Sequence, residues 1–224
     1  QMVLEANKAW HVGSENPYTI GIEHEGYVNQ TGWYTTAMFT GSSALVRDIC
    51  SSGYGINPLR TYNGPSCSGS CVLGSCVKIK GHQHYPNQTH DDPGPNWNWY
   101  TYYTMINNAP TITTMTTSGG TFYDSGGPTG NYSNDQRTTR LIQPAGATNI
   151  TLTFTQFSLE NNYDYMYVYN GATTSSPLIG RYTGTTLPGT ISGGSALLLD
   201  FRSDCATTDS GWAVTYTSNS TGSG

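Results

Sequence analysis

The sequence predicts two domains: an α/β domain, with a mixed sheet flanked by helices, over residues 1–107, and an all-β sandwich over residues 121–217. Apolar residues recur at helical spacing in the first part, whereas the second part consists of short alternating segments between turns. Residues 108–120 carry no charge and no helical pattern, which predicts an extended linker. The Ser/Thr/Gly-rich residues 218–224 are expected to form a disordered tail.

The first domain is predicted to alternate strands with helices. Residues 1–4 read as part of a strand and carry no start signal, so we interpret the chain as processed or incomplete. An apolar strand is expected at 18–22, and a helix at 35–51, where apolar residues recur three and four positions apart. A short strand at 77–80 leads into a His-rich loop, and 97–107 is expected to be the last helix.

The second domain is predicted from short segments of alternating polarity. Turn signals such as Asn170-Gly171 and Pro188-Gly189 separate these segments. This spacing is typical of an all-β sandwich of about 100 residues. The clearest segments are 149–154, 165–169, 196–201 and 212–216.

The composition favours a protein that works outside the cell. Charged residues make up only 10% of the 224 residues, and Gly, Tyr, Thr, Ser and Asn take their place. A net charge of −5 argues against a nucleic-acid partner, because phosphate binding requires clustered Lys and Arg. No apolar run approaches the roughly 20 residues that span a bilayer, so no membrane span is expected.

The cysteines indicate an oxidising compartment. Three of them lie close together in a Gly/Ser-rich loop, where we expect a disulfide. A structural zinc cluster is the alternative, although the spacing matches no paired C-x-x-C pattern. The odd count leaves one thiol free or paired outside the chain, and the pairing is open among Cys50, Cys67, Cys71, Cys76 and Cys205. Glycosylation sequons compatible with export occur at Asn29, Asn87, Asn131, Asn149 and Asn219.

The His-rich loop over residues 81–99 is the main candidate for chemistry. It combines imidazole and carboxylate groups, which are the donors of a zinc site with an open coordination position. The Pro93-Gly94-Pro95 turn restricts the backbone and would hold such ligands in place. The alternative is a polar surface loop flanked by aromatic residues. The candidate side chains are His82, His84, His90, Asp91 and Asp92.

Three short pieces of the first half carry a family resemblance. They are Ala9-Trp10-His11-Val12-Gly13, then Ile20-Gly21-Ile22-Glu23, and finally Gly81-His82 with Asp92-Pro93-Gly94-Pro95 ten residues later. In order and spacing they resemble the zinc-dependent N-acetylmuramoyl-L-alanine amidases, the type 2 amidases that include peptidoglycan recognition proteins and phage amidases. The resemblance covers residues 1–107.

The resemblance implies metal-assisted hydrolysis of an amide. His82 and Asp92 would hold Zn²⁺, which lowers the pKa of a bound water toward neutrality. Glu23 would take the proton of that water and pass it to the leaving amine. The bond broken would join the lactyl group of N-acetylmuramic acid to the L-Ala of the stem peptide, so peptidoglycan or a muropeptide would be the partner.

The resemblance also implies further site residues. His90 stands where relatives often carry a Lys that stabilises the oxyanion, and an imidazole N–H can donate there too. Trp10 and His11 would border the substrate cleft. Relatives have another zinc histidine upstream of the first motif, and this sequence contains no such segment. The chain is therefore incomplete at its N-terminus, completed by a neighbouring chain, or no longer an enzyme.

The second half resembles a CUB domain over residues 120–217. The resemblance rests on Phe122-Tyr123-Asp124-Ser125-Gly126-Gly127, Tyr163-Asp164-Tyr165, Phe201-Arg202-Ser203-Asp204 and Gly211-Trp212. It implies a jelly-roll sandwich of β-strands. It also implies a Ca²⁺ site, because many CUB domains bind the ion through three acidic positions that here would be Glu160, Asp164 and Asp204. The alternative is a set of polar loop ends without metal.

Two functions from different classes follow. The first is a secreted zinc-dependent amidase that digests peptidoglycan, with the CUB domain as a binding or stabilising module. The second is a catalytically inactive extracellular protein that binds glycans or assembles with copies of itself as a homo-oligomer, since short strands and low charge favour pairing at sheet edges.

Overall fold

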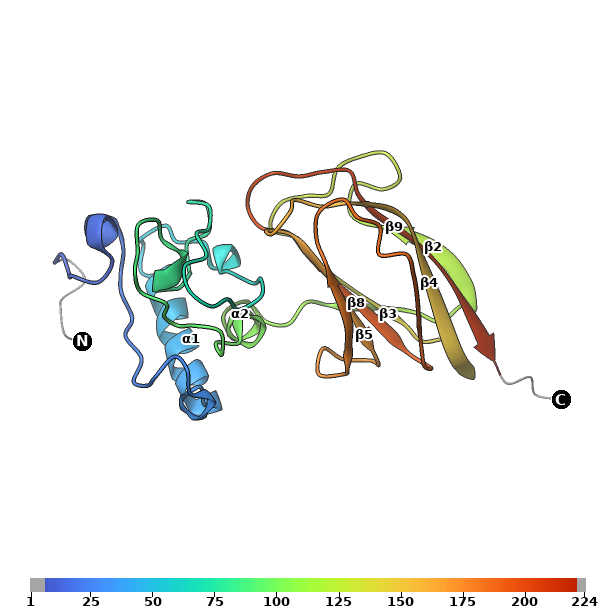
Figure 1. The fold of residues 1–224 in the computed structure, drawn as a ribbon, viewed down its shortest axis with the longest axis horizontal. Helices are drawn as coiled ribbons and strands as arrows, with labels where there is room; N and C mark the ends of the chain where they lie inside the picture. The colour runs from blue at the N-terminus through green and yellow to red at the C-terminus, as the bar shows by residue number, and fades with distance from the viewer. Residues whose placement is uncertain (1–6, 221–224) are drawn as a thin grey trace. The chain divides into compact units, whose positions relative to one another are not determined.

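The computed structural model describes residues 7–220, and the chain divides into two compact units between Asn108 and Ala109 (Figure 1). The strand expected at residues 1–4 lies outside the described residues. So do residues 221–224 of the expected tail. None of the helices in the described part is long and apolar enough to cross a membrane.

The first unit is built from helices, 3-10 turns and loops. Its segments are η1 (Gly13–Tyr18), η2 (Thr31–Trp33), α1 (Thr36–Ser51), η3 (Pro58–Arg60), η4 (His82–His84) and α2 (Trp99–Asn107). Both expected helices are therefore confirmed. Each begins at a polar cap: the Thr35 hydroxyl accepts a hydrogen bond from the Met38 N–H at 3.2 Å, and the side-chain Oδ1 of Asn98 accepts one from the Thr101 N–H at 2.9 Å.

An aromatic cluster holds the two helices together. Trp97 is buried and lies 4.7 Å from Phe39 of α1 and 4.9 Å from Tyr102 of α2, measured between ring centroids. The ring of His24 packs on the same indole at 5.0 Å. Because these contacts come from the loop, both helices and the segment before α1, the cluster fixes all of them around one core.

The expectation of a strand at 18–22 is wrong. Tyr18 ends η1 with 83% of its surface exposed, and the following residues adopt no regular structure. The strand expected at 77–80 is reduced to one parallel bridge between Thr61 and Ile79. A strand needs a neighbour to satisfy its backbone groups, and the described residues of this unit offer no second strand beside either segment.

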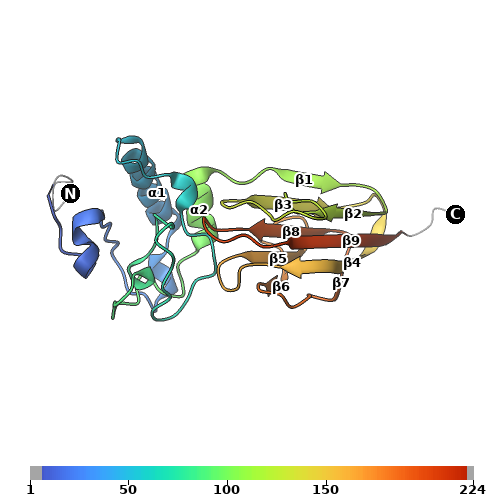
Figure 2. The ribbon, with the colours of Figure 1, turned by 90° about the horizontal axis from the view of Figure 1, so that it is seen from above.

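The second unit is the expected all-β sandwich (Figure 2). One sheet has the order β1-β3-β8-β5-β6 and the other β2-β9-β4-β7. The strands are β1 (Ile112–Met115), β2 (Gly119–Tyr123), β3 (Arg137–Ile142), β4 (Ala147–Ser158), β5 (Tyr165–Asn170), β6 (Leu178–Tyr182), β7 (Thr190–Gly193), β8 (Leu197–Arg202) and β9 (Gly211–Ser220). All four segments expected from alternation are confirmed, as parts of β4, β5, β8 and β9.

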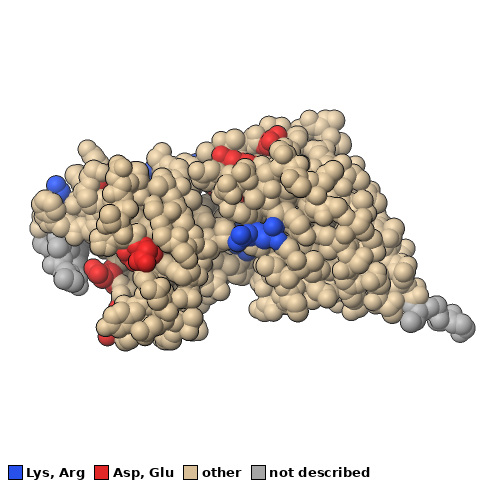
Figure 3. Space-filling model, viewed as in Figure 1, with Lys and Arg blue, Asp and Glu red and all other residues tan. Residues whose placement is uncertain are grey.

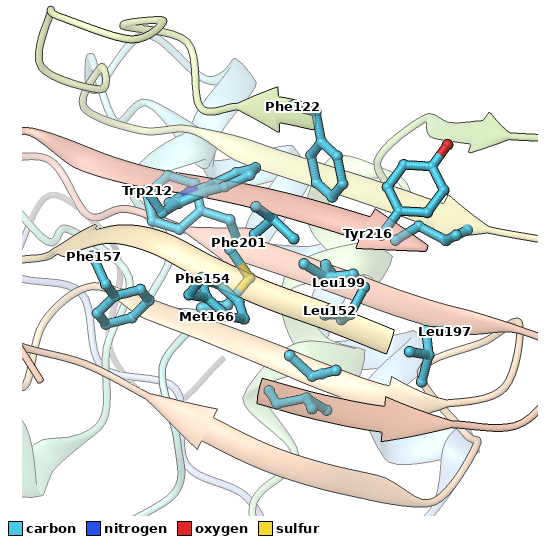
Figure 4. Packing of buried hydrophobic residues seen from close by; sticks show 14 of the residues in the cluster. Phe122, Leu152, Phe154, Phe157, Met166, Leu197, Leu199, Phe201, Trp212 and Tyr216 are labelled. Atoms are coloured by element: carbon cyan, nitrogen blue, oxygen red, sulfur yellow. The ribbon is translucent and has the colours of Figure 1, made fainter. Parts of the chain in front are cut away.

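Alternate residues of the central strands fill the space between the two sheets. On β8, Leu197, Leu199 and Phe201 point inward, and Trp212 of β9 packs edge-on against Phe201 at 5.8 Å (Figure 4). Successive side chains of a strand point to opposite faces, so every second residue of β8 faces the other sheet, while Leu198 packs in a second buried cluster on the opposite face. The acidic loops described below are therefore mounted on a densely packed framework.

The linker and tail expectations need correction. The segment 108–120 contains β1, which pairs in parallel with β3, and the beginning of β2, which pairs with β9. Strand β9 continues through Ser220, so residues 218–220 belong to the sheet. Threonine and isoleucine favour strands, but β1 is short and mostly exposed, and its partner lies far away in sequence. No local pattern could therefore distinguish it from a linker.

The sparse charge of the sequence is visible at the surface. Most of the face drawn in Figure 3 is uncharged, with a few separate groups of acidic and basic side chains.

Candidate functional site

The His-rich loop brings two histidines and one aspartate together. Ligand atoms of His82, His90 and Asp92 all lie within 4.8 Å of one another. The His82 Nδ1 atom is 3.4 Å from Asp92 Oδ1, and the His90 Nδ1 atom is 3.8 Å from the same oxygen. The two imidazole rings are stacked with centroids 4.3 Å apart. The predicted pair is therefore adjacent, and His90 joins it.

The geometry of this group fits a zinc ion. Both nitrogen–oxygen separations exceed the 2.7–3.2 Å of ordinary hydrogen bonds. Two ligands of a tetrahedral zinc, each about 2.0–2.1 Å from the metal, lie about 3.3–3.4 Å apart, which is the spacing of His82 and Asp92. His90 lies slightly farther away. Imidazole and carboxylate are ligands that zinc accepts, and the Asp92 side chain is partly exposed to solvent.

The buried side chain of Gln83 holds the two ends of the loop together. The backbone N–H of Gln83 donates to the Asp92 carbonyl at 3.0 Å, and the side-chain Oε1 accepts from the Gly94 N–H at 2.7 Å. Its Nε2 donates to the Cys67 carbonyl at 3.1 Å, next to the Cys67–Cys71 disulfide. With only 1% of Gln83 exposed, these bonds replace water and fix His82 beside Asp92.

The disulfide expectation for this loop is confirmed by the Cys67–Cys71 bond. Cys50 is a free cysteine, half-buried in α1, in line with the odd cysteine count.

A glycine lets the two halves of the third motif approach each other. A Cβ atom at position 81 would lie 2.2 Å from Pro93 Cδ and 3.2 Å from the Asp92 carbonyl oxygen. Any larger residue would therefore push the histidine-bearing turn away from the aspartate. The Gly-His and Asp-Pro pieces are thus in direct contact in this chain.

His84, a candidate side chain of the His-rich loop, is a structural residue. It is fully buried, its Nδ1 accepts a hydrogen bond from the Gly81 N–H at 3.0 Å, and its ring packs edge-on against Tyr62. Burial lowers the pKa of His84 to about 3, and the positive charge of Lys80 adds to the shift. Its Nδ1 lone pair is occupied by the backbone and is not offered to a metal.

The other predicted residues lie on the segment before α1. Glu23 is exposed, and among the described residues it does not belong to the His82 group. Its neighbour His24 is anchored by a hydrogen bond of 2.7 Å between His24 Nε2 and the Ser42 hydroxyl, which in turn bonds the Tyr102 hydroxyl. The backbone that carries Glu23 is thereby tied to both helices.

The first two motifs pack on each other. The His11 Nε2 atom bonds the Thr19 hydroxyl at 2.8 Å, and a Cβ atom at Gly21 would approach the His11 ring to 2.7 Å. The Gly of the second motif is therefore needed for the His of the first. Trp10 is 86% exposed, with the Lys8 amine over its ring at 4.9 Å.

A second acidic group occupies loop ends of the sandwich. Carboxylate oxygens of Glu160, Asp164 and Asp204 lie within 4.8 Å of one another. Asp164 is fully buried and accepts hydrogen bonds from the Tyr132 hydroxyl at 2.5 Å and the Asp204 N–H at 2.7 Å. Burial raises the pKa of Asp164 to about 7, despite these hydrogen bonds. Burial and the Asp204 charge also raise the pKa of Glu160, whose Oε2 is buried without a partner.

This acidic group fits a calcium ion. Three carboxylates held close together repel one another, and a divalent cation relieves that repulsion. Calcium takes oxygen ligands, and the buried Glu160 Oε2 without a hydrogen-bond donor is such an oxygen. All three predicted residues are thus brought together.

Sequence reasoning missed the residues that hold these groups. Gln83 and Gln88, whose Oε1 lies 2.8 Å from His82 Nε2, gave no signal, because glutamine in a polar loop follows no pattern. Tyr132 lies between the quoted pieces of the CUB resemblance, and its hydroxyl meets Asp164 only in the folded chain.

Comparisons with known proteins divide the chain in the same way as the structure. Residues 1–95 match the family model for N-acetylmuramoyl-L-alanine amidase, and residues 112–216 match that for the CUB domain. N-acetylmuramoyl-L-alanine amidase A of Achromobacter lyticus is 37% identical over 108 residues, which are 48% of this chain and 60% of that protein. Human cubilin is 36% identical over 99 residues, 42% of this chain and 3% of cubilin. The chain thus spans less than two thirds of either relative.

Among solved structures, the CUB1-EGF-CUB2 domains of rat MASP-1 are similar, with a TM-score of 0.42 and 21% identity over 49% of this chain and 43% of that one.

The neutral, buried His84 makes the first unit sensitive to acid. The unfolded histidine takes up a proton below its ordinary pKa of 6.5, whereas the folded one does so only near 3. Stability from this residue is therefore present above pH 6.5 and is lost as pH falls toward 3, by about 1.4 kcal/mol per pH unit. Urea unfolding followed by NMR signals of α1 should show this loss between about pH 6 and 4.

The His84→Asn variant is the matched control, because an amide oxygen can still accept from the Gly81 N–H but does not titrate. Its unfolding free energy should fall less steeply with acid. Parallel curves for the two proteins would contradict the assignment of a neutral His84.

Proposed function

The chain joins a segment of the N-acetylmuramoyl-L-alanine amidase family to a CUB domain, and we propose that it acts as a zinc-dependent amidase. The bond it would cleave is the lactyl–L-Ala amide of peptidoglycan or muropeptides. The observation that carries the proposal is the 3.4 Å distance between His82 Nδ1 and Asp92 Oδ1. These are the two residues that the Gly-His and Asp-Pro-Gly-Pro motif predicts as zinc ligands. Their spacing is longer than an ordinary hydrogen bond and equals the spacing of two ligands on one tetrahedral zinc ion.

His82 and Asp92 are the residues that would hold zinc. The chemistry a zinc ion supplies at such a site is activation of water for attack on an amide carbonyl. His90, stacked on His82 and 63% exposed, would donate a hydrogen bond to the carbonyl oxygen as that oxygen gains negative charge. The stacking limits how far its ring can turn, so the donor would be oriented before the substrate arrives.

Glu23 is the proposed proton carrier. It would accept a proton from the attacking water and deliver it to the leaving amine. Support comes from its place at the end of the Ile-Gly-Ile-Glu motif and from the anchoring of His24 on Ser42. Trp10 and His11, on the segment packed against this motif, are proposed to line the substrate cleft.

The compartment we propose is outside the cell, where peptidoglycan lies. The Cys67–Cys71 disulfide supports this assignment, because disulfides persist in oxidising surroundings. Low charge and the CUB domain agree with it.

The second candidate function is an inactive extracellular protein that binds glycans or assembles with itself. Two observations favour it: Glu23 is not in the His82 group, and Trp10 exposes a large aromatic face of the kind that stacks on sugars. Turnover by the chain decides between the two candidates.

For the CUB domain we propose a Ca²⁺ site formed by Glu160, Asp164 and Asp204. The ion would replace the mutual repulsion of the three carboxylates with attraction and would hold the loop ends of the sandwich together.

Replacing Glu23 by Gln is expected to lower the release of stem peptide from muropeptides by about 10²–10⁴-fold, because the proton carrier is lost. Zinc content, measured by plasma mass spectrometry, should be unchanged. The matched control is Glu25→Gln, an exposed carboxylate two residues along the same segment, which should keep near-normal turnover. Equal turnover of the two variants would contradict the assignment, and zinc-bound protein without any turnover would favour the second candidate.

Calcium is expected to raise the melting temperature of the second unit, and Asp164→Asn should abolish the rise. The Asn amide has one oxygen and therefore cannot accept from both Tyr132 and the Asp204 N–H, so the calcium-free variant is expected to melt lower than the wild type. The reading that tests the site is the calcium-dependent rise of each protein, measured from its own calcium-free melting temperature. Magnesium, which needs a smaller octahedral shell, should give a smaller rise. Equal calcium responses of the two proteins, measured by calorimetry, would rule the site out.

A further inference from the structure

Gln88 lies on the far side of the His82 ring from Asp92. Its Oε1 is 2.8 Å from His82 Nε2, while His82 Nδ1 faces Asp92 Oδ1 at 3.4 Å. We propose that Gln88 is a positioning residue that fixes the tautomer of His82, so that Nε2 carries the proton and Nδ1 offers its lone pair to the metal. The inference rests on the proposed zinc site and extends it to the residue that selects the ligand atom.

The orientation of the Gln88 amide follows from its surroundings. Its Nε2 is 3.5 Å from the Pro86 carbonyl oxygen, so the NH₂ end of the amide points toward an acceptor. The Oε1 end points toward the imidazole of His82. The reverse orientation would set two carbonyl oxygens against each other. A neutral imidazole has one N–H and one lone pair, and an oxygen at Nε2 therefore requires the N–H there.

The Gln88 amide also lies near the start of η1. A Cβ atom added at Gly13 would lie 3.7 Å from Gln88 Nε2, which is ordinary van der Waals distance. Gly13 ends the first motif, so the Gln88 amide lies close to that motif as well as to His82.

The neighbouring His84 shows why a selector is needed. In His84 the backbone N–H of Gly81 occupies Nδ1, and that nitrogen is not available to a metal. His82 stands on the same 3-10 turn, and without Gln88 its proton could move to Nδ1, where it would bond Asp92 and close the site. The other ring nitrogen of a metal-binding histidine usually donates to such an acceptor, and loss of that partner typically lowers metal affinity 10–100-fold.

The test compares Gln88→Met, which removes the acceptor at similar size, with Gln88→Glu, which keeps an acceptor. Two-bond ¹H–¹⁵N NMR spectra of the metal-free chain should show His82 protonated at Nε2 in the wild type and in Gln88→Glu, and a mixture of tautomers in Gln88→Met. Zinc affinity, measured by competition with a chelator, should fall about 10–100-fold in Gln88→Met and recover in Gln88→Glu. Gln30→Met, which removes an exposed amide bonded to Trp33, should change neither reading.

The outcomes separate this inference from the proposed function. Tight zinc binding by Gln88→Met with unchanged His82 signals would overturn the role of Gln88 and leave the amidase proposal intact. Weaker binding by Gln88→Met in a chain without turnover would support Gln88 and overturn the amidase. A wild-type chain that binds no zinc would overturn both.

Discussion

The buried amide of Gln83 is the contact on which the proposed metal site depends. Its backbone and side chain bond the Asp92 carbonyl, the Gly94 N–H and the Cys67 carbonyl, so three separate backbone segments meet at one residue. His82 precedes Gln83 directly in sequence. The distance between the two ligands is thus set by bonds from the residue next to His82 to the backbone of Asp92 itself and of Gly94. Each buried group left without its partner would cost about 1–3 kcal/mol, which makes the arrangement hard to loosen in part.

Close approach between chain segments explains why glycine occupies particular positions of the motifs. Gly81 lets Pro93 lie against the histidine turn, and Gly21 lets the His11 ring lie against the second motif. In both places a glycine in one piece makes room for a ring in another piece, Pro93 for Gly81 and His11 for Gly21. The glycines of these motifs therefore allow close packing between chain segments, and the proposed zinc ligands lie next to these contacts. The sandwich follows the same logic, since buried Asp164 is held by Tyr132 from a different loop.

The sequence could predict what depends on local pattern. Helical spacing gave both helices, alternation gave the central strands, and the spacing of Gly81-His82 and Asp92-Pro93 gave two residues that do lie together. It failed where pairing is distant: residues 18–22 are apolar but have no strand beside them in the described chain, and β1 was mistaken for a linker. Gln83 and Gln88 could not be foreseen, because their importance comes from which atoms surround them after folding.

The central claim is that one zinc ion binds between His82 Nδ1 and Asp92. Crystals of the zinc-loaded chain, measured at the zinc absorption edge, test it most directly. The account predicts a strong anomalous peak about 2.0–2.2 Å from His82 Nδ1 and from one Asp92 oxygen, with Gln88 still bonded to Nε2. A zinc peak at His82 Nε2, at the cysteine loop, or at neither histidine of the His82–His90 pair would contradict it.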